Sequence, residues 1–312
     1  MTMPRIVVIG GGLMGIGIAQ VFACAGRRVC IIEPLDAVRA TIIERLRKSL
    51  ALMDADAEAV DRVETSADLG SAVATASYVT EAVPEKLELK RAIFAELVEK
   101  APRAAILASN TSVIPIGRIA EGLATGDRIV GTHWWNPAPL IPLVEVVQSS
   151  GTSDATVAAA MDMLQSIGKR PAHVKKDLPG FVANRLQHAL WREAIAMVAE
   201  GICDARTLDD CVKNSFGLRL PVLGPLENAD LVGLDLTLDI HKTIIPELDR
   251  HDRPNELLEQ YVAAGRLGFK SGEGFRAWTA DEMAALRIRL THHLLQAQRG
   301  QSGEQSIADH RP

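Results

Sequence analysis

Short apolar runs alternate with longer amphipathic segments over the first part of the chain. The runs are rich in β-branched residues, which predicts buried strands at residues 6–9, 29–32, 77–83, 104–108, 128–133, 143–147 and 170–175. Between them, apolar residues recur at helical spacing at about 13–25, 36–52, 54–61, 86–100 and 153–167, with a further helix from near Pro115. Strands that alternate with helices predict a doubly wound α/β sheet.

The pattern changes after Asp177-Leu-Pro-Gly180, where only helical spacing continues. Helices are expected at about 181–200, 205–215, 227–246, 254–264 and 279–298, and the polar residues 299–312 are expected to form a disordered tail. We therefore predict an α/β domain over 1–178 and an all-α domain over 179–298.

A glycine-rich turn follows the first predicted strand and opens the first helix. Gly10, Gly12 and Gly15 match the pattern G-x-G-x-x-G. In that pattern the first glycine permits the tight turn, the second lets the backbone approach a pyrophosphate, and the third lets the helix pack close to the strand. The free N–H groups and the dipole of the helix start attract the phosphates.

The second predicted strand ends in Glu33, at the usual spacing from the glycines. A carboxylate there accepts hydrogen bonds from a ribose 2′-hydroxyl and repels a 2′-phosphate, and no arginine directly follows it. The sequence thus predicts NAD rather than NADP as cofactor, bound by a Rossmann-type domain that precedes the all-α C-terminal domain.

Bulk composition is that of an ordinary globular protein. The chain has 312 residues, 47% of them hydrophobic and 23% charged. A net charge of −5 favours neither a nucleic acid nor an anionic membrane as a partner. His292 and His293 are adjacent and face different sides of a helix, so no metal site is predicted.

The cysteines and the apolar runs bear on location. Cys24 and Cys30 fall in predicted core elements and are expected to be buried free thiols. The first strand begins near Arg5, which leaves no room for a signal peptide, and no 18-residue apolar run occurs. A cytoplasmic protein is expected.

Polar residues follow several predicted strands, at the ligand side of a doubly wound sheet. Glu85 and Lys90 are expected near the cofactor or as charges at the start and on the surface of a helix. The loop Ser109-Asn-Thr-Ser112 either holds a substrate oxygen or caps the next helix. Two roles are open for the basic residues Arg45, Arg47 and Lys48: they are expected either to bind the phosphates of a large substrate or to form a solvated helix face.

Glu145 stands out because it lies within an apolar strand, where a carboxylate is costly to bury unless it is hydrogen-bonded. His133 ends the preceding strand, and the Pro-rich loop between them is able to fold one strand beside the other. A carboxylate on one imidazole nitrogen fixes the tautomer and frees the other nitrogen to take a proton. The residues alone leave open whether such a pair is structural or catalytic.

These motifs together resemble the L-3-hydroxyacyl-CoA dehydrogenase family along nearly the full chain. The matching stretches are Ile9-Gly-Gly-Gly-Leu-Met-Gly15, Glu81-Ala-Val-Pro-Glu85, Ser109-Asn-Thr-Ser112, His133-x-x-Asn-Pro137, Leu143-Val-Glu-Val146, Pro179-Gly-Phe-Val-x-Asn-Arg185, Gly224-Pro225 and Gly268-x-Lys-x-Gly-x-Gly-Phe275. The resemblance implies NAD-linked oxidation of a secondary alcohol to a ketone, and a helical domain that mediates dimerisation.

The resemblance also implies roles for individual residues. It makes His133 the catalytic base, Glu145 its orienting partner, and Ser112 and Asn184 the groups that hold the substrate oxygen. Cofactor binding is predicted, from the glycine pattern and the strand ends, for Gly10, Gly12, Leu13, Met14, Gly15, Glu33, Glu85 and Lys90.

Three departures from the family pattern concern the substrate. Trp134 and Trp135 replace two phenylalanines, Pro142 replaces a lysine, and the segment between Glu33 and Glu81 is short. These features are similar to members that act on free carnitine, gulonate or pyridine carboxylates. The leading hypothesis is a 3-hydroxyacyl-CoA dehydrogenase of the 3-hydroxybutyryl-CoA type. The alternatives are the same chemistry on a small hydroxy acid without CoA, and a non-catalytic NAD-binding protein.

Overall fold

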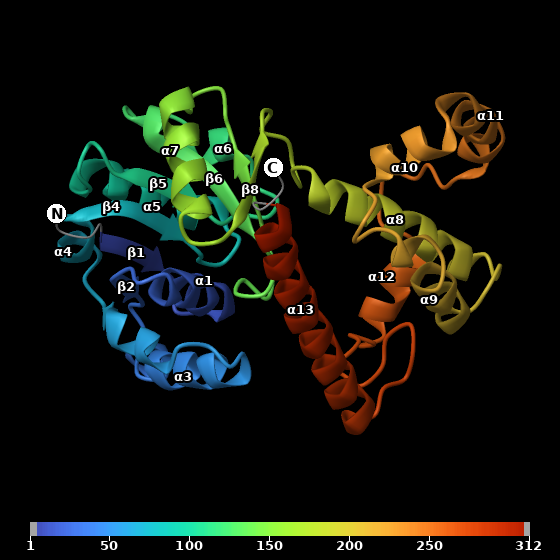
Figure 1. The fold of residues 1–312 in the computed structure, drawn as a ribbon, viewed down its shortest axis with the longest axis horizontal. Coiled ribbons are helices and arrows are strands. Elements are labelled where there is room, and N and C mark those ends of the chain that lie inside the picture. The colour runs from blue at the N-terminus through green and yellow to red at the C-terminus, as the bar shows by residue number, and fades with distance from the viewer. Residues whose placement is uncertain (1–4, 309–312) are drawn as a thin grey trace. The chain divides into compact units, whose positions relative to one another are not determined.

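The computed structural model describes the backbone of residues 5–308 and the side chains of residues 5–298. The chain divides into two compact units. The sheet unit comprises the residues up to Asn184 together with those from His292 on, and the helical unit comprises Arg185–Thr291. Figure 1 shows both units.

An eight-stranded sheet forms the centre of the sheet unit within these described residues (Figure 1). Its order is β3-β2-β1-β4-β5-β6-β7-β8, and every neighbouring pair is parallel except β6 and β7. The strands are β1 Arg5–Ile9, β2 Val29–Ile32, β3 Val63–Ser66, β4 Ala76–Glu81, β5 Ile106–Ser109, β6 Ile129–Trp134, β7 Leu143–Val147 and β8 Arg170–Val174. The crossover from β3 to β4 on the far side of β1 creates the switch point at which such sheets bind dinucleotides.

Helices cover both faces of the sheet. The segments are α1 Leu13–Cys24, α2 Asp36–Arg39, α3 Ile42–Leu52, the 3₁₀ helix η1 Ala57–Arg62, α4 Leu69–Val73, α5 Leu87–Lys100, α6 Ile116–Ala120, η2 Gly126–Arg128 and α7 Asp154–Gln165. Alternate residues of β1 illustrate the two cores: Ile6 and Val8 pack with α1, α3 and α7, whereas Val7 and Ile9 pack with α4, α5 and α6. The predicted Rossmann-type architecture is confirmed.

Two short elements of the sheet unit were not expected from the sequence. The strand β3 buries only Val63 of its four residues, so it lacks an apolar run, and α4 spans a single short turn. The helix expected at 36–52 is divided at Ala40–Thr41 into α2 and α3, and the one expected at 54–61 is the 3₁₀ helix η1.

The helical unit follows the expected all-α pattern. Its segments are α8 Ala183–Ala199, α9 Ala205–Lys213, η3 Phe216–Leu218, α10 Pro225–Val232, α11 Leu234–Ile244, η4 Ile245–Glu247, α12 Glu256–Ala263 and α13 Ala280–Ala308, of which the first and last extend into the sheet unit. The single helix expected at 227–246 is wrong, because Gly233 has φ +102° and separates α10 from α11.

Two limits of the predicted domains lie near features of the structure. The helix α13 continues to Ala308, within the stretch 299–312 for which a disordered tail is predicted, and positions 309–312 lie outside the described residues. The compact units divide after Asn184, because Phe181 is buried in the sheet unit, while the domain boundary after 178 stays a prediction.

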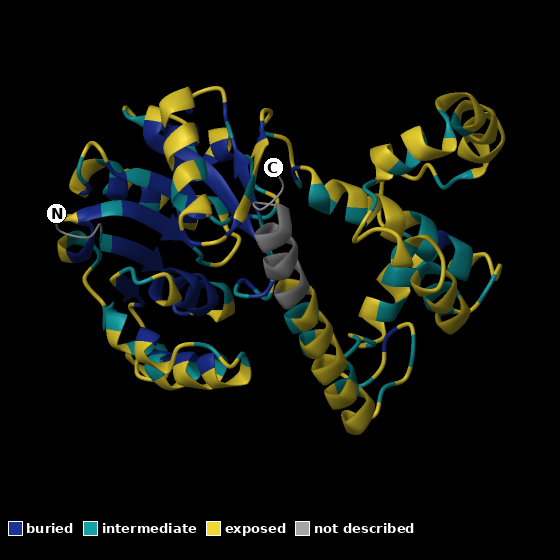
Figure 2. Ribbon diagram, viewed as in Figure 1, coloured by how far each residue is buried: buried dark blue, intermediate teal, exposed yellow. Residues whose placement is uncertain are grey.

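Burial differs between the two units, since the central strands of the sheet are buried and most residues of the helical unit are exposed (Figure 2). All four cysteines are free. Cys30 is buried as expected, but Cys24 is exposed because it follows the last buried residue of α1. Within residues 5–308, no helix combines the length and the apolar character that spanning a bilayer requires.

Candidate active site

The glycine-rich turn has the geometry that its sequence predicts. Gly10 has φ +111°, and a Cβ there would lie 2.7 Å from the carbonyl oxygen of Ala82. A Cβ on Gly15 would lie 1.9 Å from the carbonyl oxygen of Gly10, so only glycine lets α1 approach β1 so closely. A Cβ on Gly12 would meet no atom within 4 Å. Open space therefore faces the start of α1, where Leu13 and Met14 form the first turn, and this cradle fits a pyrophosphate.

Glu33 lies at the end of β2 and is tied to the glycine-rich turn. Its Oε2 accepts a hydrogen bond of 3.0 Å from the amide of Gly11, and its Oε1 accepts one of 3.0 Å from the amide of Leu35. Arg39 donates to the carbonyl oxygen of Glu33, but it also forms an ion pair with Asp36 at 2.5 Å. The carboxylate is thus held beside the dinucleotide cradle with lone pairs left for a ribose hydroxyl.

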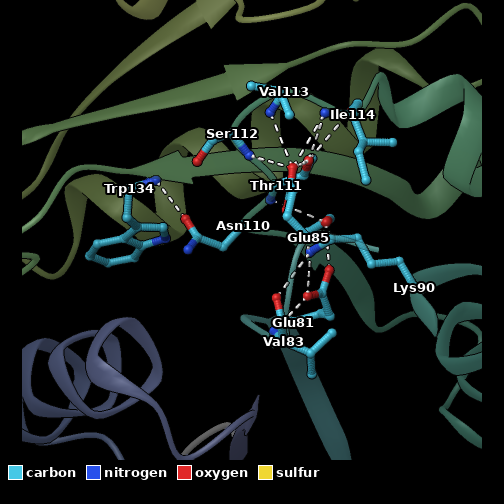
Figure 3. Close-up of polar contacts among 11 residues, drawn as sticks. Glu81, Val83, Glu85, Lys90, Asn110, Thr111, Ser112, Val113, Ile114 and Trp134 are labelled. Carbon is cyan, nitrogen blue, oxygen red and sulfur yellow. Dashed lines mark hydrogen bonds and ion pairs between the residues drawn. The ribbon is translucent and has the colours of Figure 1, made fainter. Parts of the chain in front are cut away.

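A buried ionic network lies at the carboxyl ends of β4 and β5 (Figure 3). The Lys90 Nζ lies 2.7 Å from Glu81 Oε1 and 3.2 Å from Glu85 Oε2, and Lys90 and Glu81 are wholly buried. The second Glu81 oxygen accepts a hydrogen bond of 2.7 Å from the Ser109 hydroxyl. Lys90 is therefore no helix-surface charge. Its ammonium braces the two loops that follow β4 and β5.

Glu85 anchors the loop that carries Ser112. Its Oε1 accepts hydrogen bonds from the Thr111 hydroxyl and from the amides of Ser112 and Val113, at 3.1 and 3.2 Å for the amides (Figure 3). Partial burial raises the pKa of Glu85, but these bonds and the Lys90 ammonium outweigh that effect and hold its pKa below the usual value. The ionised carboxylate thus fixes the backbone position of Ser112.

Asn110 connects the same loop to β6. Its side-chain oxygen accepts a hydrogen bond of 2.8 Å from the amide of Trp134, the residue that follows His133 (Figure 3). The backbone of Asn110 is itself held, because its amide donates to the carbonyl oxygen of Glu81. Three strand ends are therefore joined around His133.

His133 and Glu145 lie opposite each other on the antiparallel strands β6 and β7, as the Pro-rich loop suggested. The His133 Nδ1 lies 2.8 Å from Glu145 Oε2, and both side chains are buried. Because a carboxylate only accepts, the network assigns the proton to Nδ1 and leaves Nε2 for another partner.

The other Glu145 oxygen binds the start of α8. Oε1 accepts hydrogen bonds of 2.9 and 3.0 Å from the amides of Val182 and Ala183. Burial alone would raise the pKa of Glu145, but the bonds from His133 and these amides outweigh it and hold that pKa below its usual value. The carboxylate is therefore ionised at neutral pH, and burying it costs less because three donors satisfy it.

Asn184 and Ser112 complete the group of residues predicted to be catalytic. Asn184 follows Ala183 directly, and its Nδ2 donates a hydrogen bond of 3.3 Å to the carbonyl oxygen of Ser112. The structure thus links all four predicted residues, His133, Glu145, Asn184 and Ser112, through direct bonds or adjacent backbone.

Comparison with known proteins identifies the family of this chain. Residues 5–178 match the sequence model described as 3-hydroxyacyl-CoA dehydrogenase, NAD binding domain, and residues 180–278 match the model of the same family's C-terminal domain. The chain belongs to the 3-hydroxyacyl-CoA dehydrogenase family. It is therefore an NAD-dependent oxidoreductase of that family.

Curated relatives of this 3-hydroxyacyl-CoA dehydrogenase family member include enzymes with and without CoA in their names. The 5-formyl-3-hydroxy-2-methylpyridine 4-carboxylate 5-dehydrogenase of Mesorhizobium japonicum is 34% identical over an alignment of 304 positions, which covers 95% of this chain and 97% of that protein. A probable 3-hydroxybutyryl-CoA dehydrogenase of Bacillus subtilis is 37% identical over 88% of this chain and 97% of its own.

The solved structures that resemble this chain also include enzymes with and without CoA in their names. A crystal structure of the pyridine-carboxylate 5-dehydrogenase, described as an NAD⁺-dependent dismutase, matches with a TM-score of 0.87 and 32% identity, over 97% of this chain and 99% of that chain. The (S)-3-hydroxybutyryl-CoA dehydrogenase of Ralstonia eutropha matches with a TM-score of 0.74 and 33% identity, over 89% of this chain and 100% of its own.

The two tryptophans that depart from the family pattern occupy different environments. Trp134 is 2% exposed and packs in the core against Phe22, with ring centroids 6.1 Å apart. Trp135 lies beside the base, its ring centroid 5.4 Å from that of His133. Of the two, Trp135 is therefore the one that lies beside His133 and is partly exposed.

The loop between β6 and β7 is held by the buried Lys169 and packs against α1. The Lys169 Nζ donates to the carbonyl oxygens of Ala138 and Ile141 at 2.5 and 2.9 Å and lies 5.5 Å from the Trp134 ring centroid. A Cβ on Gly17 of α1 would lie only 3.2 Å from that of Ala138. The loop thus packs directly on the dinucleotide-binding helix.

The three basic residues of α3 differ in their surroundings, since Arg47 and Lys48 are exposed and Arg45 is not. Arg45 donates a hydrogen bond of 2.9 Å to the carbonyl oxygen of Gly11, and Lys48 pairs with Glu44 at 2.5 Å. Arg45 therefore supports the glycine-rich turn. Neither of the two roles considered from the sequence, contact with substrate phosphates and a solvated helix face, included this contact.

Several residues of the site were not predicted from the sequence. Glu81 carried the same signal as Glu145, an acid in an apolar strand, but was treated only as part of a motif. Asn110 and Phe181 gave no signal from residue type alone, because their roles depend on backbone groups that only the fold brings near.

Proposed function

We propose that this chain oxidises a hydroxyl-bearing carbon with His133 as general base and Glu145 as the residue that orients it. The supporting observation is the buried 2.8 Å contact between His133 Nδ1 and Glu145 Oε2, next to the strand ends where the cofactor cradle lies. A neutral imidazole held in this tautomer has Nε2 available to accept a proton.

Proton and hydride leave the substrate by separate routes. His133 Nε2 takes the hydroxyl proton as the carbonyl forms, and the Glu145 carboxylate stabilises the resulting imidazolium. Bound NAD supplies the acceptor for the hydride that leaves carbon. Reduction runs through the same residues in reverse, because His133 then returns the proton.

The loop containing Ser112 and the start of α8 are proposed to hold the reacting oxygen. Ser112 and Asn184 supply hydroxyl and amide donors, and the Asn184 contact with the Ser112 carbonyl keeps the two together. Glu85 and Lys90 act at the cofactor side by fixing the loop rather than by offering a free charge, since the Lys90 ammonium is wholly buried between carboxylates.

For the substrate, we propose a compact ring-bearing carboxylate without CoA. Of the three basic residues of α3, Arg45 is bound to the glycine-rich turn and Lys48 pairs with Glu44, so among the described residues Arg47 is the exposed cation that α3 offers to CoA phosphates without such a contact. Trp135 adds a flat aromatic surface beside His133. The pyridine-carboxylate relative also aligns over more of this chain than the CoA-named relatives described above.

The second candidate is a 3-hydroxyacyl-CoA thioester, favoured by the family match over both domains and by the 37% identity to a probable 3-hydroxybutyryl-CoA dehydrogenase. The third candidate is a protein that binds NAD without catalysis, and this candidate does not explain why His133 and Glu145 form a buried pair.

An assay panel separates these candidates. NADH formation is measured with a 3-hydroxyacyl-CoA, with the matching free hydroxy acid, and with hydroxymethyl and formyl pyridine carboxylates, whose hydrated aldehyde also carries a hydroxyl. We expect the highest kcat/KM for a pyridine carboxylate. A preference for the thioester of about 10³ or more, roughly 4 kcal/mol of transition-state binding, would reject the compact substrate. Absence of turnover on every compound, with NAD still bound, would favour the non-catalytic alternative.

We also propose a homodimer in the cytoplasm. The helical unit exposes many large apolar side chains that a second copy is able to cover, among them Val222, Leu226 and Leu231. The four free cysteines are those of a protein in a reducing compartment.

A further inference from the structure

Phe181 has an unusual backbone for its residue type. Its φ is +49°, in the left-handed region that residues with a bulky side chain rarely adopt, and the preceding Gly180 has φ +76°. Such conformations persist where the surrounding structure holds them, and they cluster at functional sites. Phe181 is only 2% exposed, so packing does hold it.

This turn delivers donors to the carboxylate behind the base. The two amides that follow Phe181, those of Val182 and Ala183, both donate to Glu145 Oε1, at 2.9 and 3.0 Å. These two amides stand at the start of α8, where N–H groups have no partner within the helix and point the same way, and the left-handed turn at Phe181 directs this helix start at one carboxylate oxygen.

The side chain of the same residue packs against the base itself. The ring centroid of Phe181 lies 5.6 Å from that of His133, with the rings tilted by 56°. Trp135 lies against the imidazole at 5.4 Å, with a tilt of 59°. Glu145 is the charged group recorded in contact with His133 among the described residues, so the two aromatic rings and one carboxylate define the orientation of the imidazole.

We propose that Phe181 is a positioning residue that sets both members of the His133–Glu145 pair, the imidazole through its ring and the carboxylate through the two amides that follow it. This inference rests on the proposed catalytic role of the pair. A single turn at the beginning of α8 thereby adjusts the base and its partner together, and a change at Phe181 acts on the reaction without touching the substrate.

The test is a double-mutant cycle between Phe181→Leu and Glu145→Gln, with kcat, KM and melting temperature measured for each variant. Phe94→Leu is the matched control, because Phe94 is a fully buried phenylalanine of the same apolar cluster, on α5. We expect Phe181→Leu to lower kcat by about tenfold in the natural background and by less than about twofold when Glu145→Gln is present, since residues that act as a unit are not additive. Phe94→Leu should change kcat by the same factor in both backgrounds.

Equal kcat losses from Phe181→Leu in the two backgrounds would overturn the proposal and leave Phe181 as a packing residue. If Phe181→Leu fails to fold, Phe181→Gly, which accepts φ +49° without strain, replaces it in the cycle with the same expectations. The proposed function fails differently, because Glu145→Gln alone would then retain near-full kcat.

Discussion

Glu33 combines a structural role with a predicted selective one. Its carboxylate accepts a hydrogen bond from the amide of Gly11 within the glycine-rich turn, and the sequence pattern predicts that it also binds the ribose. The sequence was sufficient to predict its place and charge, because the spacing from the glycines is regular. The neighbouring Arg39 was not foreseen, since only the fold brings it to the carbonyl oxygen of Glu33.

We predict that the natural protein prefers NAD strongly over NADP and that Glu33→Ala narrows the preference by roughly tenfold or more, because a 2′-phosphate no longer meets a carboxylate. The measurement is the ratio of kcat/KM for the two cofactors. Equal or better turnover of the natural protein with NADP would contradict this account of Glu33.

His133 and Glu145 show the same limits at the residue scale. An acid in an apolar strand needed a partner, and His133 was the nearest candidate in sequence, so the pair was predictable. The amides of Val182 and Ala183 were not, because they lie beyond another helix and strand in the sequence and any residue type supplies an amide. Backbone donors leave no trace in a sequence.

At the scale of elements, strong periodicity decided what was predictable. The buried strands and the long helices of the sheet unit were found, whereas β3 and α4 were missed because each buries very few apolar residues. Gly233 broke a predicted helix because its backbone adopts φ +102°, and an isolated glycine in a helical pattern is often tolerated.

Lys169, which supports the β6–β7 loop, is predicted to make the stability of the protein depend on pH. Burial lowers the pKa of Lys169 to about 8, below the value of about 10.4 for an exposed lysine. Between these values the unfolded chain binds the proton and the folded protein releases it, so Lys169 makes the stability rise with pH. Relative to Lys169→Met, the melting temperature of the natural protein should gain roughly 2–4 °C between pH 8 and 9.5. If the melting temperatures of the two proteins changed equally with pH, the buried Lys169 ammonium would keep its proton over this range, and the prediction would be wrong.

At the scale of the whole molecule, the division into an α/β and a helical part was predictable from the loss of strand pattern after 178. The division of the compact units after Asn184, as distinct from the predicted domain boundary, was not, because it depends on Phe181, which packs in the sheet unit. The continuation of α13 to Ala308 was also missed, since its polar end lacks the apolar spacing that marks a packed helix.

The exposed apolar side chains of the helical unit lead us to predict a dimer at micromolar concentration. Sedimentation velocity measures this directly. Leu226→Glu should shift the equilibrium toward monomer, because it introduces a charge at a large apolar side chain that is 79% exposed. A natural protein that sediments as a monomer would count against the predicted assembly.

The most direct test of the central claim is kcat for His133→Ala and Glu145→Gln on the best substrate of the panel, together with NADH affinity by fluorescence. We predict kcat losses of roughly 10²–10⁴-fold for His133→Ala and a marked loss for Glu145→Gln through the wrong tautomer, with NADH affinity unchanged. Glu44→Gln, at an exposed carboxylate paired with Lys48, is the control and should keep full kcat. If either His133→Ala or Glu145→Gln retained kcat within about twofold of the natural protein, the pair would be structural and the proposed mechanism would be wrong.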